Sequence, residues 1–239
     1  MKRALVTGGT KGIGLAISQM LLREGYFVTV TYASDANAAE ACNCTLKLIS
    51  PNFEIIKADQ SDKEEMKNLV RHLLEHDELN CIVCNTGITL KKALTDITDA
   101  EWENVMAVNV NTPFFLIRDL YSIIPHGSRI IFIGSEMAIY PHGTSIAYGV
   151  SKSAVHALAT NLVKFFEDTG TTVNAIAPGF VETEWQSTKP EHIRQNICEK
   201  TAIKRFATVE EIADAARFCI NNPFVNGSII EVNGGYCYK

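Results

Sequence analysis

The sequence predicts an α/β protein with a doubly wound, mostly parallel sheet of seven strands and helices on both faces. Short apolar runs alternate with segments of helical periodicity along the whole chain, a pattern typical of parallel sheets. A glycine-rich turn follows the first apolar run and leads into a helical segment. No linker, repeat or low-complexity segment interrupts the alternation, so we expect residues 1–239 to form a single domain.

The expected strands are short runs rich in apolar and β-branched residues. They lie at about residues 3–7, 27–32, 53–58, 81–84, 129–134, 172–177 and 228–232. Helix starts are marked by capping boxes, in which Ser or Thr is followed three residues later by Glu. These pairs are Ser61 with Glu64, Thr98 with Glu101, and Thr208 with Glu211. Pro113 is expected to break or restart a helical region, because proline lacks an amide hydrogen.

The composition is typical of a soluble globular protein, with 46% hydrophobic and 21% charged residues. A net charge of −5 gives no reason to expect nucleic acid or an anionic membrane as a partner. No apolar stretch approaches the roughly eighteen residues of a membrane span. The chain enters its first expected strand directly after Met-Lys-Arg, which leaves no room for a signal peptide. We therefore expect a cytoplasmic protein.

Two pairs of residues have the spacing of a metal or redox site, one pair of cysteines and one pair of histidines. Cys81 and Cys84 are three apart on an expected strand and so point to opposite faces, which favours buried apolar cysteines. His72 and His76 are spaced to share a helix face and hold a metal. They do not form His-Glu-x-x-His, however, so a solvated face is the preferred interpretation. No metal site is expected.

The glycine-rich turn reads Thr7-Gly-Gly-Thr-Lys-Gly-Ile-Gly14. Its glycines let the backbone approach a pyrophosphate, and the helix that follows supplies amide hydrogens and a positive dipole at its N-terminus. The spacing differs from the usual G-x-G-x-x-G fingerprint, but the strand, turn and helix context is the one a dinucleotide site requires. The motif therefore predicts a sheet of the Rossmann type.

Tyr148 and Lys152 are four residues apart, and Ser135 precedes Tyr148 by thirteen residues. On a helix the first two share a face. Lys152 is then expected to lie near the Tyr148 hydroxyl and to lower a phenol pKa that is otherwise about 10. Such a pair can protonate a carbonyl oxygen, and a hydroxyl such as that of Ser135 can hydrogen-bond the same oxygen. The Tyr-x-x-x-Lys spacing suits any exposed helix, so it becomes a signal only together with the glycine-rich turn.

These motifs, taken in order, resemble the short-chain dehydrogenase/reductase family in its compact form, over essentially the whole chain. The resemblance rests on the glycine turn, Asp59, Asn85-Thr86-Gly87, Asn109, Ser135, Tyr148, Lys152 and Pro178-Gly179. Within the family, Arg205-Phe206, the run 210–213 and the ending 232–236 are most similar to bacterial 3-oxoacyl-acyl-carrier-protein reductases.

The resemblance implies a role for each site residue. Tyr148 is the general acid of reduction and Lys152 also binds the nicotinamide ribose, while Asn109 holds a water that relays protons to Lys152. Asp59 accepts from the adenine amino group, with a loop cap as its alternative role, and Thr183 contacts the nicotinamide carboxamide. The expected cofactor-binding residues are Gly8, Thr10, Lys11, Gly12, Ile13, Gly14, Tyr32, Ser34, Asp59, Gln60, Asn85, Thr86, Gly87, Tyr148, Lys152, Pro178, Gly179, Val181 and Thr183.

The end of the second expected strand bears on the choice of cofactor. An NAD site there needs an acid for the ribose 2′-hydroxyl, yet the chain reads Val-Thr-Tyr-Ala-Ser with no acid until Asp35. Lys11 can offer a cation to a 2′-phosphate instead. The sequence favours NADP, and Asp35 keeps NAD open.

The leading functional hypothesis is an NADP(H)-dependent oxidoreductase that reduces a carbonyl to an alcohol, most similar to 3-oxoacyl-acyl-carrier-protein reductase. Those reductases carry basic residues before the fifth and sixth strands, where an acidic carrier docks. Here residues 120–127 lack positive charge and residues 165–170 include acids, which would weaken electrostatic steering. A free small ketone, keto-ester or sugar-derived carbonyl is the alternative substrate. A catalytically silent dinucleotide-binding regulator is a further alternative, which degenerate catalytic residues would favour.

The helix expected from Tyr148 to Glu167 is apolar around most of its circumference. One face must cover the sheet, which leaves apolar surface for an interface. Family resemblance implies a homotetramer built on this helix and on residues 98–124. A monomer whose loops cover the helix is the alternative.

Overall fold

The sheet has seven strands, all paired in parallel, in the order β3-β2-β1-β4-β5-β6-β7. The structure is a computed structural model that describes residues 1–76, 78–141, 143 and 145–236. The strands are β1 (Arg3–Val6), β2 (Phe27–Tyr32), β3 (Phe53–Lys57), β4 (Cys81–Cys84), β5 (Arg129–Ile133), β6 (Thr172–Pro178) and β7 (Ile229–Val232). The predicted doubly wound, Rossmann-type sheet is confirmed.

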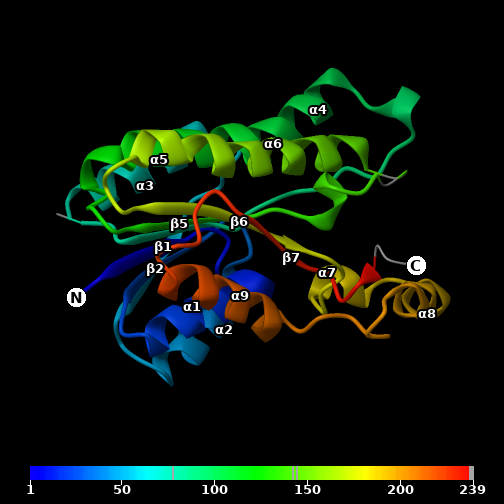
Figure 1. The fold of residues 1–239 in the computed structure, drawn as a ribbon, viewed down its shortest axis with the longest axis horizontal. Coiled ribbons are helices and arrows are strands. Elements are labelled where there is room, and N and C mark those ends of the chain that lie inside the picture. Colours follow the sequence, from blue (N-terminus) through cyan, green and yellow to red (C-terminus); the bar gives the residue numbers. More distant parts are fainter. Residues whose placement is uncertain (77, 142, 144, 237–239) are drawn as a thin grey trace.

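Helices form a layer on each face of the sheet (Figure 1). One layer holds α3 (Lys63–Leu74), α4 (Asp99–Met106), α5 (Thr112–Leu120) and α6 (Ile146–Leu162). The other holds α1 (Gly12–Arg23), α2 (Ala36–Lys47) and α9 (Val209–Asn221). Two more helices, α7 (Glu184–Ser187) and α8 (Glu191–Lys200), lie together at one end of the molecule. None of the helices described is long and apolar enough to cross a membrane.

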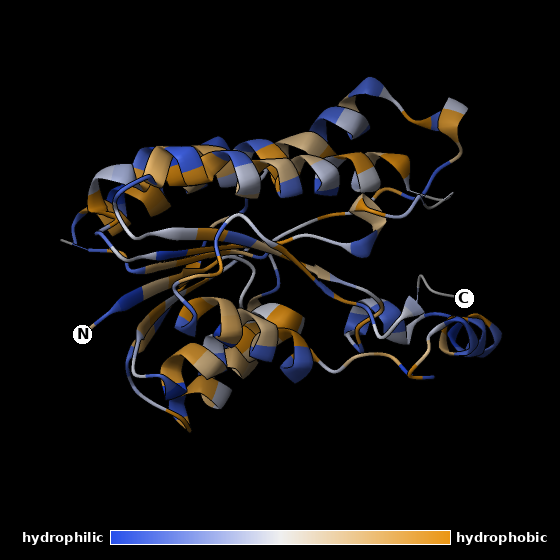
Figure 2. Ribbon diagram, viewed as in Figure 1, coloured by the Kyte–Doolittle hydropathy of each residue, from blue (hydrophilic) through white to orange (hydrophobic). Residues whose placement is uncertain are grey.

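A separate hydrophobic core lies on each side of the sheet. On one side Leu21 of α1 and Ile212 of α9 pack in one buried cluster. On the other side Leu73 of α3, Leu116 of α5 and Val155 of α6 share a second cluster. Figure 2 shows hydrophobic residues concentrated on the strands and on the helix sides that face them. Burying each such side chain contributes about 1.5–3 kcal/mol, so the two cores hold both helical layers against the sheet.

Two of the three predicted capping boxes are confirmed, at the starts of α4 and α9. Thr98 and Thr208 each accept from the amide of the Glu three residues on, and that Glu reaches back to the cap. The box predicted at Ser61 is wrong. The Ser61 hydroxyl donates to Asp59 at 2.8 Å, and Asp62 caps α3 instead, accepting from the amides of Glu64 and Glu65.

Pro113 lies in the first turn of α5. Asn111 and Thr112 just before it already have helical φ and ψ, so the helix changes type near the proline instead of ending and starting anew. A π-helical turn, Ala107–Asn111, joins α4 to α5. Such turns insert an extra residue into a helix and are frequent at functional sites. This one holds Asn109.

The cysteines of β4 are confirmed as buried apolar residues. Cys81 and Cys84 are almost fully buried and neither forms a disulfide, and burial raises the pKa of each thiol to about 12. The two histidines at the end of α3, His72 and His76, are partly exposed. The His72 side chain is 37% exposed, and its Nε2 lies 3.0 Å from the Glu54 Oε2.

Candidate active site

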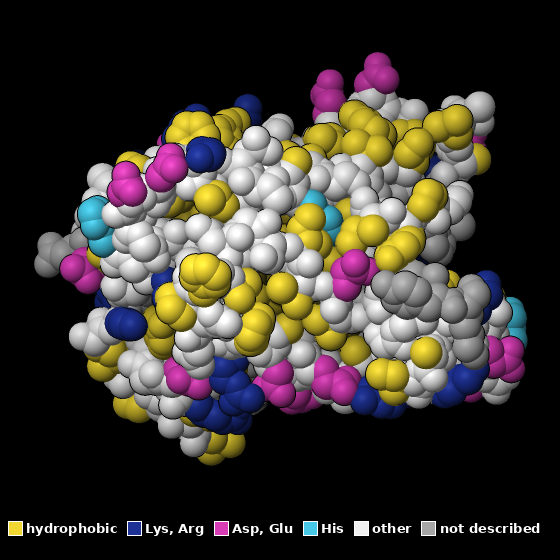
Figure 3. All heavy atoms as spheres, viewed as in Figure 1, with side chains coloured by type: hydrophobic (Ala, Val, Ile, Leu, Met, Phe, Trp, Pro, Cys, Tyr) yellow, Lys and Arg dark blue, Asp and Glu magenta, His cyan; other side chains and the backbone are white. Residues whose placement is uncertain are grey.

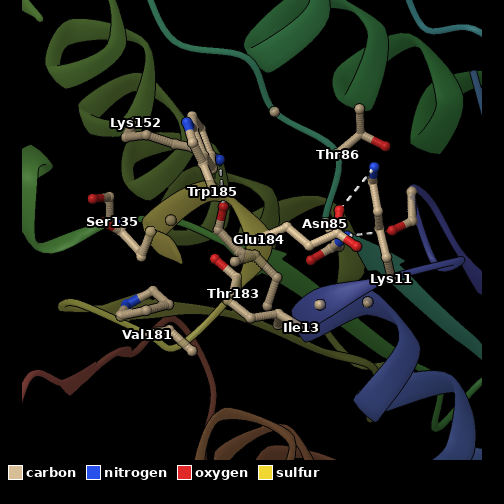
Figure 4. A pocket seen from close by; sticks show the side chains of 18 of the residues that line it. Lys11, Ile13, Asn85, Thr86, Ser135, Lys152, Val181, Thr183, Glu184 and Trp185 are labelled. Carbon is tan, nitrogen blue, oxygen red and sulfur yellow. Dashed lines mark hydrogen bonds and ion pairs between the residues drawn. The ribbon is translucent and has the colours of Figure 1, made fainter. Parts of the chain in front are cut away.

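A cleft of about 670 Å³ lies at the carboxyl ends of the strands. There the strand order reverses between β1 and β4, which is where open α/β sheets bind ligands. Most of the expected site residues line it: Gly8, Lys11, Gly12, Ile13, Gly14, Asn85, Thr86, Gly87, Ser135, Tyr148, Lys152, Pro178, Gly179, Val181 and Thr183. Figure 4 shows Ser135 and Lys152 on one side of the cleft and Lys11 and Thr86 on the other, with Glu184 and Trp185 between them.

The glycine turn brings backbone to the floor of this cleft. Gly8 and Gly12 have φ of +60° and +56°, a region that favours glycine. A Cβ on Gly14 would lie 2.4 Å from the Gly8 carbonyl oxygen, so only glycine fits at the start of α1. Within the described chain, no side chain caps the N-terminus of α1. Its amides and dipole are therefore directed to the cleft, which suits an anion.

Asn85 fastens the glycine turn to the end of β4. Its Nδ2 donates to the carbonyl oxygens of Thr7 and Gly8 at 2.9 and 3.0 Å, and its backbone amide donates to the Thr7 hydroxyl at 3.0 Å. Thr86 follows, and its Oγ1 would lie 2.8 Å from a Cβ placed on Gly8. The two motifs, far apart in the sequence, thus form one rigid wall.

Four expected residues at the ends of β2 and β3 lie outside the lining of the cleft. Tyr32 lines a shallower hollow against α2. Asp59 accepts from the Ser61 amide and hydroxyl, both at 2.8 Å, so its alternative role as a loop cap is present. Gln60 lines a groove beside α3, α4 and α5, and its carbonyl accepts from the Thr112 hydroxyl at 2.9 Å. Ser34 is the fourth of these residues. Two other expected residues, the buried Thr10 and Asn109, also lie outside the lining of the cleft.

Tyr148 and Lys152 project from α6 toward the end of β5. The Lys152 ammonium lies 5.7 Å from the centre of the Tyr148 ring and donates to the Ile133 carbonyl oxygen at 2.7 Å. Burial lowers the pKa of Lys152 to about 8, since a buried ammonium loses hydration. Lys152 is thus close to its titration point near neutral pH.

The expected direction of the Tyr148 pKa is wrong. Burial raises it, and a hydrogen bond with Ser135 acts in the opposite direction. A tyrosine with a raised pKa keeps its proton at neutral pH, so Tyr148 is set up as an acid.

Ser135 lies two residues beyond the end of β5 and is almost fully buried. Its backbone amide faces Nε2 of His156 at 3.5 Å, and its Oγ accepts from the Met137 amide at 3.1 Å. Burial and the Lys152 charge lower the pKa of His156 to about 4, so His156 is neutral and accepts through Nε2. Sequence reasoning missed His156, and its position four residues after Lys152 was the only available signal.

Asn109 lies behind the cleft and joins two elements of the site. Its Oδ1 accepts from the Ile88 amide at 2.8 Å, and its Nδ2 donates to the Ile88 carbonyl and the Ser151 hydroxyl, both at 2.9 Å. Ser151 in turn donates to the Tyr148 carbonyl at 2.8 Å. A Cβ on Gly87 would meet Lys152 Nζ at 3.1 Å and Asn109 Oδ1 at 3.5 Å. Asn109 therefore fixes the loop after β4 against α6.

Comparison with known proteins decides the family, because residues 2–194 match the model of short chain dehydrogenases. The chain belongs to this family. It is 30% identical to "Uncharacterized oxidoreductase YmfI" of Bacillus subtilis, with 98% of each chain covered. It is 28% identical to the 3-oxoacyl-acyl-carrier-protein reductase FabG of Staphylococcus aureus, covering 98% of this chain and 97% of that protein. A short chain dehydrogenase from Burkholderia cenocepacia, solved in complex with NADP, superposes with a TM-score of 0.92 at 28% identity, covering 99% and 98%.

The protein is thus an enzyme of the short-chain dehydrogenase/reductase family, as the order of its motifs implied. No motif in this sequence predicted the structure of the segment that covers the cleft. Here it includes α7, where Trp185 packs edge-on against Tyr148 with ring centres 6.2 Å apart. Gln186 and Thr188 also line the cleft.

Lys11 joins this covering segment to the glycine turn. Its ammonium lies 3.0 Å from Asp35 and 3.3 Å from Glu184, and Figure 4 shows the Lys11 and Glu184 side chains extending toward each other. The hydrogen bond with Asp35 raises the pKa of Lys11, although partial burial opposes it. Asp35 also caps α2 by accepting from the Ala38 amide at 3.0 Å. This hydrogen bond and the one from Lys11 lower the pKa of Asp35.

Glu136 is a further residue that sequence reasoning did not single out. It directly follows Ser135 and is 6% exposed. A Cβ on Gly179 would lie 3.0 Å from its Oε2, so Glu136 lies against the turn after β6. Burial and the charge of Glu231 raise the pKa of Glu136 to about 7.

Proposed function

We propose that this enzyme is an NADP(H)-dependent reductase that converts a carbonyl to an alcohol. The observation that carries the proposal is the convergence of Ser135, Tyr148 and Lys152 at one end of a cleft whose other end is the glycine turn. A bound nicotinamide supplies the hydride in this chemistry. The protein has to bind the cofactor, orient the carbonyl and deliver a proton.

The proposed division of labour follows the burial and contacts of the three residues. Ser135 donates a hydrogen bond to the substrate oxygen and polarises it. Tyr148, kept protonated by burial, gives its proton to the developing alkoxide. Lys152 stabilises the resulting tyrosinate, and its lowered pKa suits the return of a proton to Tyr148. In the oxidative direction Tyr148 acts as the base.

Asn109 is proposed as the positioning residue of the proton path. It binds Ile88 and Ser151, and its Oδ1 and the Lys152 Nζ both lie close to the point where a Cβ on Gly87 would be. A water held at the Ile88 end of this network would connect Lys152 to solvent.

The chain fits a dinucleotide on three counts. Gly8 and Gly12 adopt positive φ at the turn, Gly14 leaves no room for a side chain, and the N-terminus of α1 opens to the cleft. Asp59 is proposed to approach the adenine from the end of β3. Pro178, Val181 and Thr183 would hold the nicotinamide end.

NADP is the proposed cofactor, with NAD as the alternative. Lys11 is half-exposed and lies at the turn, where it can meet a 2′-phosphate. The Burkholderia cenocepacia relative was solved with NADP. Asp35 favours NAD, because its carboxylate lies 3.0 Å from Lys11 and would repel the 2′-phosphate of NADP. The charge of Lys11 has to neutralise that carboxylate before a phosphate can bind.

Two substrate classes are proposed. Similarity to FabG favours a 3-oxoacyl group on a carrier protein, as in fatty acid biosynthesis. Exposed Glu167 and Asp168 beside β6 favour a free ketone, keto-ester or sugar-derived carbonyl, because they would repel an acidic carrier. Lys189 directly follows Thr188 of the cleft lining, and burial and the charge of Lys91 lower the pKa of Lys189. This local positive charge suits a substrate that carries a negative group.

A substrate panel tests the proposed function. Purified enzyme is assayed with NADPH and with NADH against acetoacetyl-carrier protein, acetoacetyl-CoA, and neutral and anionic free ketones. We expect NADPH-dependent reduction of at least one carbonyl class, with anionic substrates ahead of neutral ones of the same size. Cofactor binding without turnover on every class would favour the silent regulator instead.

We also propose a cytoplasmic homotetramer. Phe114 and Phe115 of α5, Val150 of α6 and Phe165 are each at least 37% exposed, and Figure 3 shows hydrophobic side chains at the surface over the layer that holds these helices. Exposed apolar patches of this kind mark interfaces. The proposed interfaces are α6 with its continuation and the region of α4 and α5.

A further inference from the structure

Three metal-ligating side chains come together between β3 and α3, away from the cleft. Glu54 lies in β3, while His72 lies in the last turn of α3 and His76 just beyond it. One ligand atom from each lies within 4.8 Å of the other two. The His72 Nε2 and the Glu54 Oε2 are 3.0 Å apart, and the two imidazole rings are perpendicular with centres 5.6 Å apart.

The Glu54 carboxylate is held in place by its other oxygen. Oε1 accepts from the Thr29 hydroxyl at 2.7 Å and pairs with the Arg3 guanidinium at 3.5 Å. These contacts from β2 and β1 leave Oε2 directed at His72. Hydrogen bonds of this kind orient carboxylate ligands and raise metal affinity.

We propose that Glu54, His72 and His76 bind a divalent transition-metal ion such as Zn²⁺ or Ni²⁺, with water completing the coordination. Two imidazoles and a carboxylate are ligands these ions accept. Around a tetrahedral ion with bonds of about 2.0–2.1 Å the ligand atoms lie about 3.4 Å apart. The 4.8 Å spread would close to this value by rotation of the two partly exposed imidazoles toward Oε2 of the fixed Glu54 carboxylate.

The ion would tie the end of α3 to the sheet. Glu54 pairs in register with Thr29 of β2, so the bridge would reach from the helical layer into the sheet. An ion that binds only the folded chain stabilises it. The site lies apart from the residues that line the cleft, so its test does not depend on the proposed function.

Calorimetric titration of untagged, EDTA-treated and dialysed protein with NiCl₂ and ZnCl₂ tests the proposal. We expect one ion per chain and a rise in Tm when the ion is in excess. Glu54→Gln, His72→Ala and His76→Ala should each weaken binding by about tenfold or more and remove the Tm rise. His126→Ala is the matched control, because it removes an exposed histidine in a turn elsewhere, and it should bind as the wild type does.

Exposed thiols are a competing source of binding, since Cys44 is exposed and Cys198 partly so. The Co²⁺ complex distinguishes them, because thiolate ligation adds an intense near-ultraviolet charge-transfer band that nitrogen and oxygen ligands lack. We expect no such band. Substitutions at Glu54 in β3 or His72 in α3 can unfold the chain. His76 lies beyond the end of α3, so His76→Ala still tests the site in that case. Absence of binding, wild-type affinity in His76→Ala, or a thiolate band would overturn the proposal.

Discussion

Glu136 carries a carboxyl group into a buried position between Ser135 and the turn after β6. Its folded-state pKa of about 7 lies above the ordinary value of 4.5, so the folded protein holds this proton more tightly than the unfolded chain. Stability therefore falls as pH rises from about 4.5 to 7, and above pH 7 the full cost of a buried carboxylate is present.

Glu136→Gln should relieve that cost. We expect the variant to gain on the order of 1–3 kcal/mol in the free energy of unfolding at pH 8, with little gain at pH 4.5, where the wild-type carboxyl is protonated in both states. Urea unfolding at the two pH values measures the difference. An equal effect at both would show that the ionisation of Glu136 is not responsible.

Lys11 is the residue on which the choice of cofactor depends. Because its ammonium faces Asp35, Lys11→Ala should leave that carboxylate facing the cofactor and weaken NADPH binding by about tenfold, the loss of one charge-assisted bond. NADH binding should change much less. Fluorescence titration of both cofactors, with Lys92→Ala as a control that removes a lysine paired elsewhere with Glu101, decides this. Wild-type protein that binds NADH as tightly as NADPH would point to Asp35 as a ribose ligand.

At the level of elements, the start of α3 shows where local sequence rules reach their limit. Ser61 and Asp62 are both good capping residues, and a Glu lies three residues after each. Asp62 is the capping residue because the Ser61 hydroxyl is hydrogen-bonded to Asp59. That contact depends on the path of the chain after β3, which the capping pattern does not contain.

Asp62→Ala should destabilise the protein by about 0.5–2 kcal/mol, the usual cost of losing an N-cap. Ser61→Ala should cost less, because the Ser61 side chain bonds only Asp59 and leaves the helix amides satisfied. Thermal unfolding of the two variants in parallel measures the difference. A larger loss in Ser61→Ala would restore the capping box that the structure rejects.

Much of the fold and the cleft was predictable, because both depend on local order. The periodicity of strands and helices was enough to predict a parallel sheet. Motifs at the carboxyl ends of parallel strands meet at one edge of such a sheet, as Gly12, Asn85 and Ser135 do. The orientation of single side chains was not predictable. Gln60 lines a groove beside α3, α4 and α5 instead of the cleft, burial outweighs the other influences on the Tyr148 pKa, and Glu54 meets His72 across 18 residues. Each depends on tertiary packing.

At the scale of the whole molecule, the exposed apolar surface of α5 and α6 predicts assembly. Light scattering at micromolar concentration should give about four times the 26.3 kDa chain mass, and Val150→Glu with Phe165→Glu should shift the protein toward smaller species, because a buried charge opposes association. Phe224→Glu is the control, a fully exposed phenylalanine on another part of the surface. A mass near 26 kDa for the wild type would refute the oligomer.

The central claim is that Tyr148 donates the proton in carbonyl reduction, with Lys152 and Ser135 placed to assist. The most direct measurement is the kcat of Tyr148→Phe on a carbonyl substrate that the wild type reduces, together with the Kd for NADPH. Phenylalanine keeps the ring that packs against Trp185 and removes only the hydroxyl. We predict a fall in kcat of about 10²–10⁴-fold with a nearly unchanged Kd for NADPH. A kcat close to that of the wild type would contradict the claim.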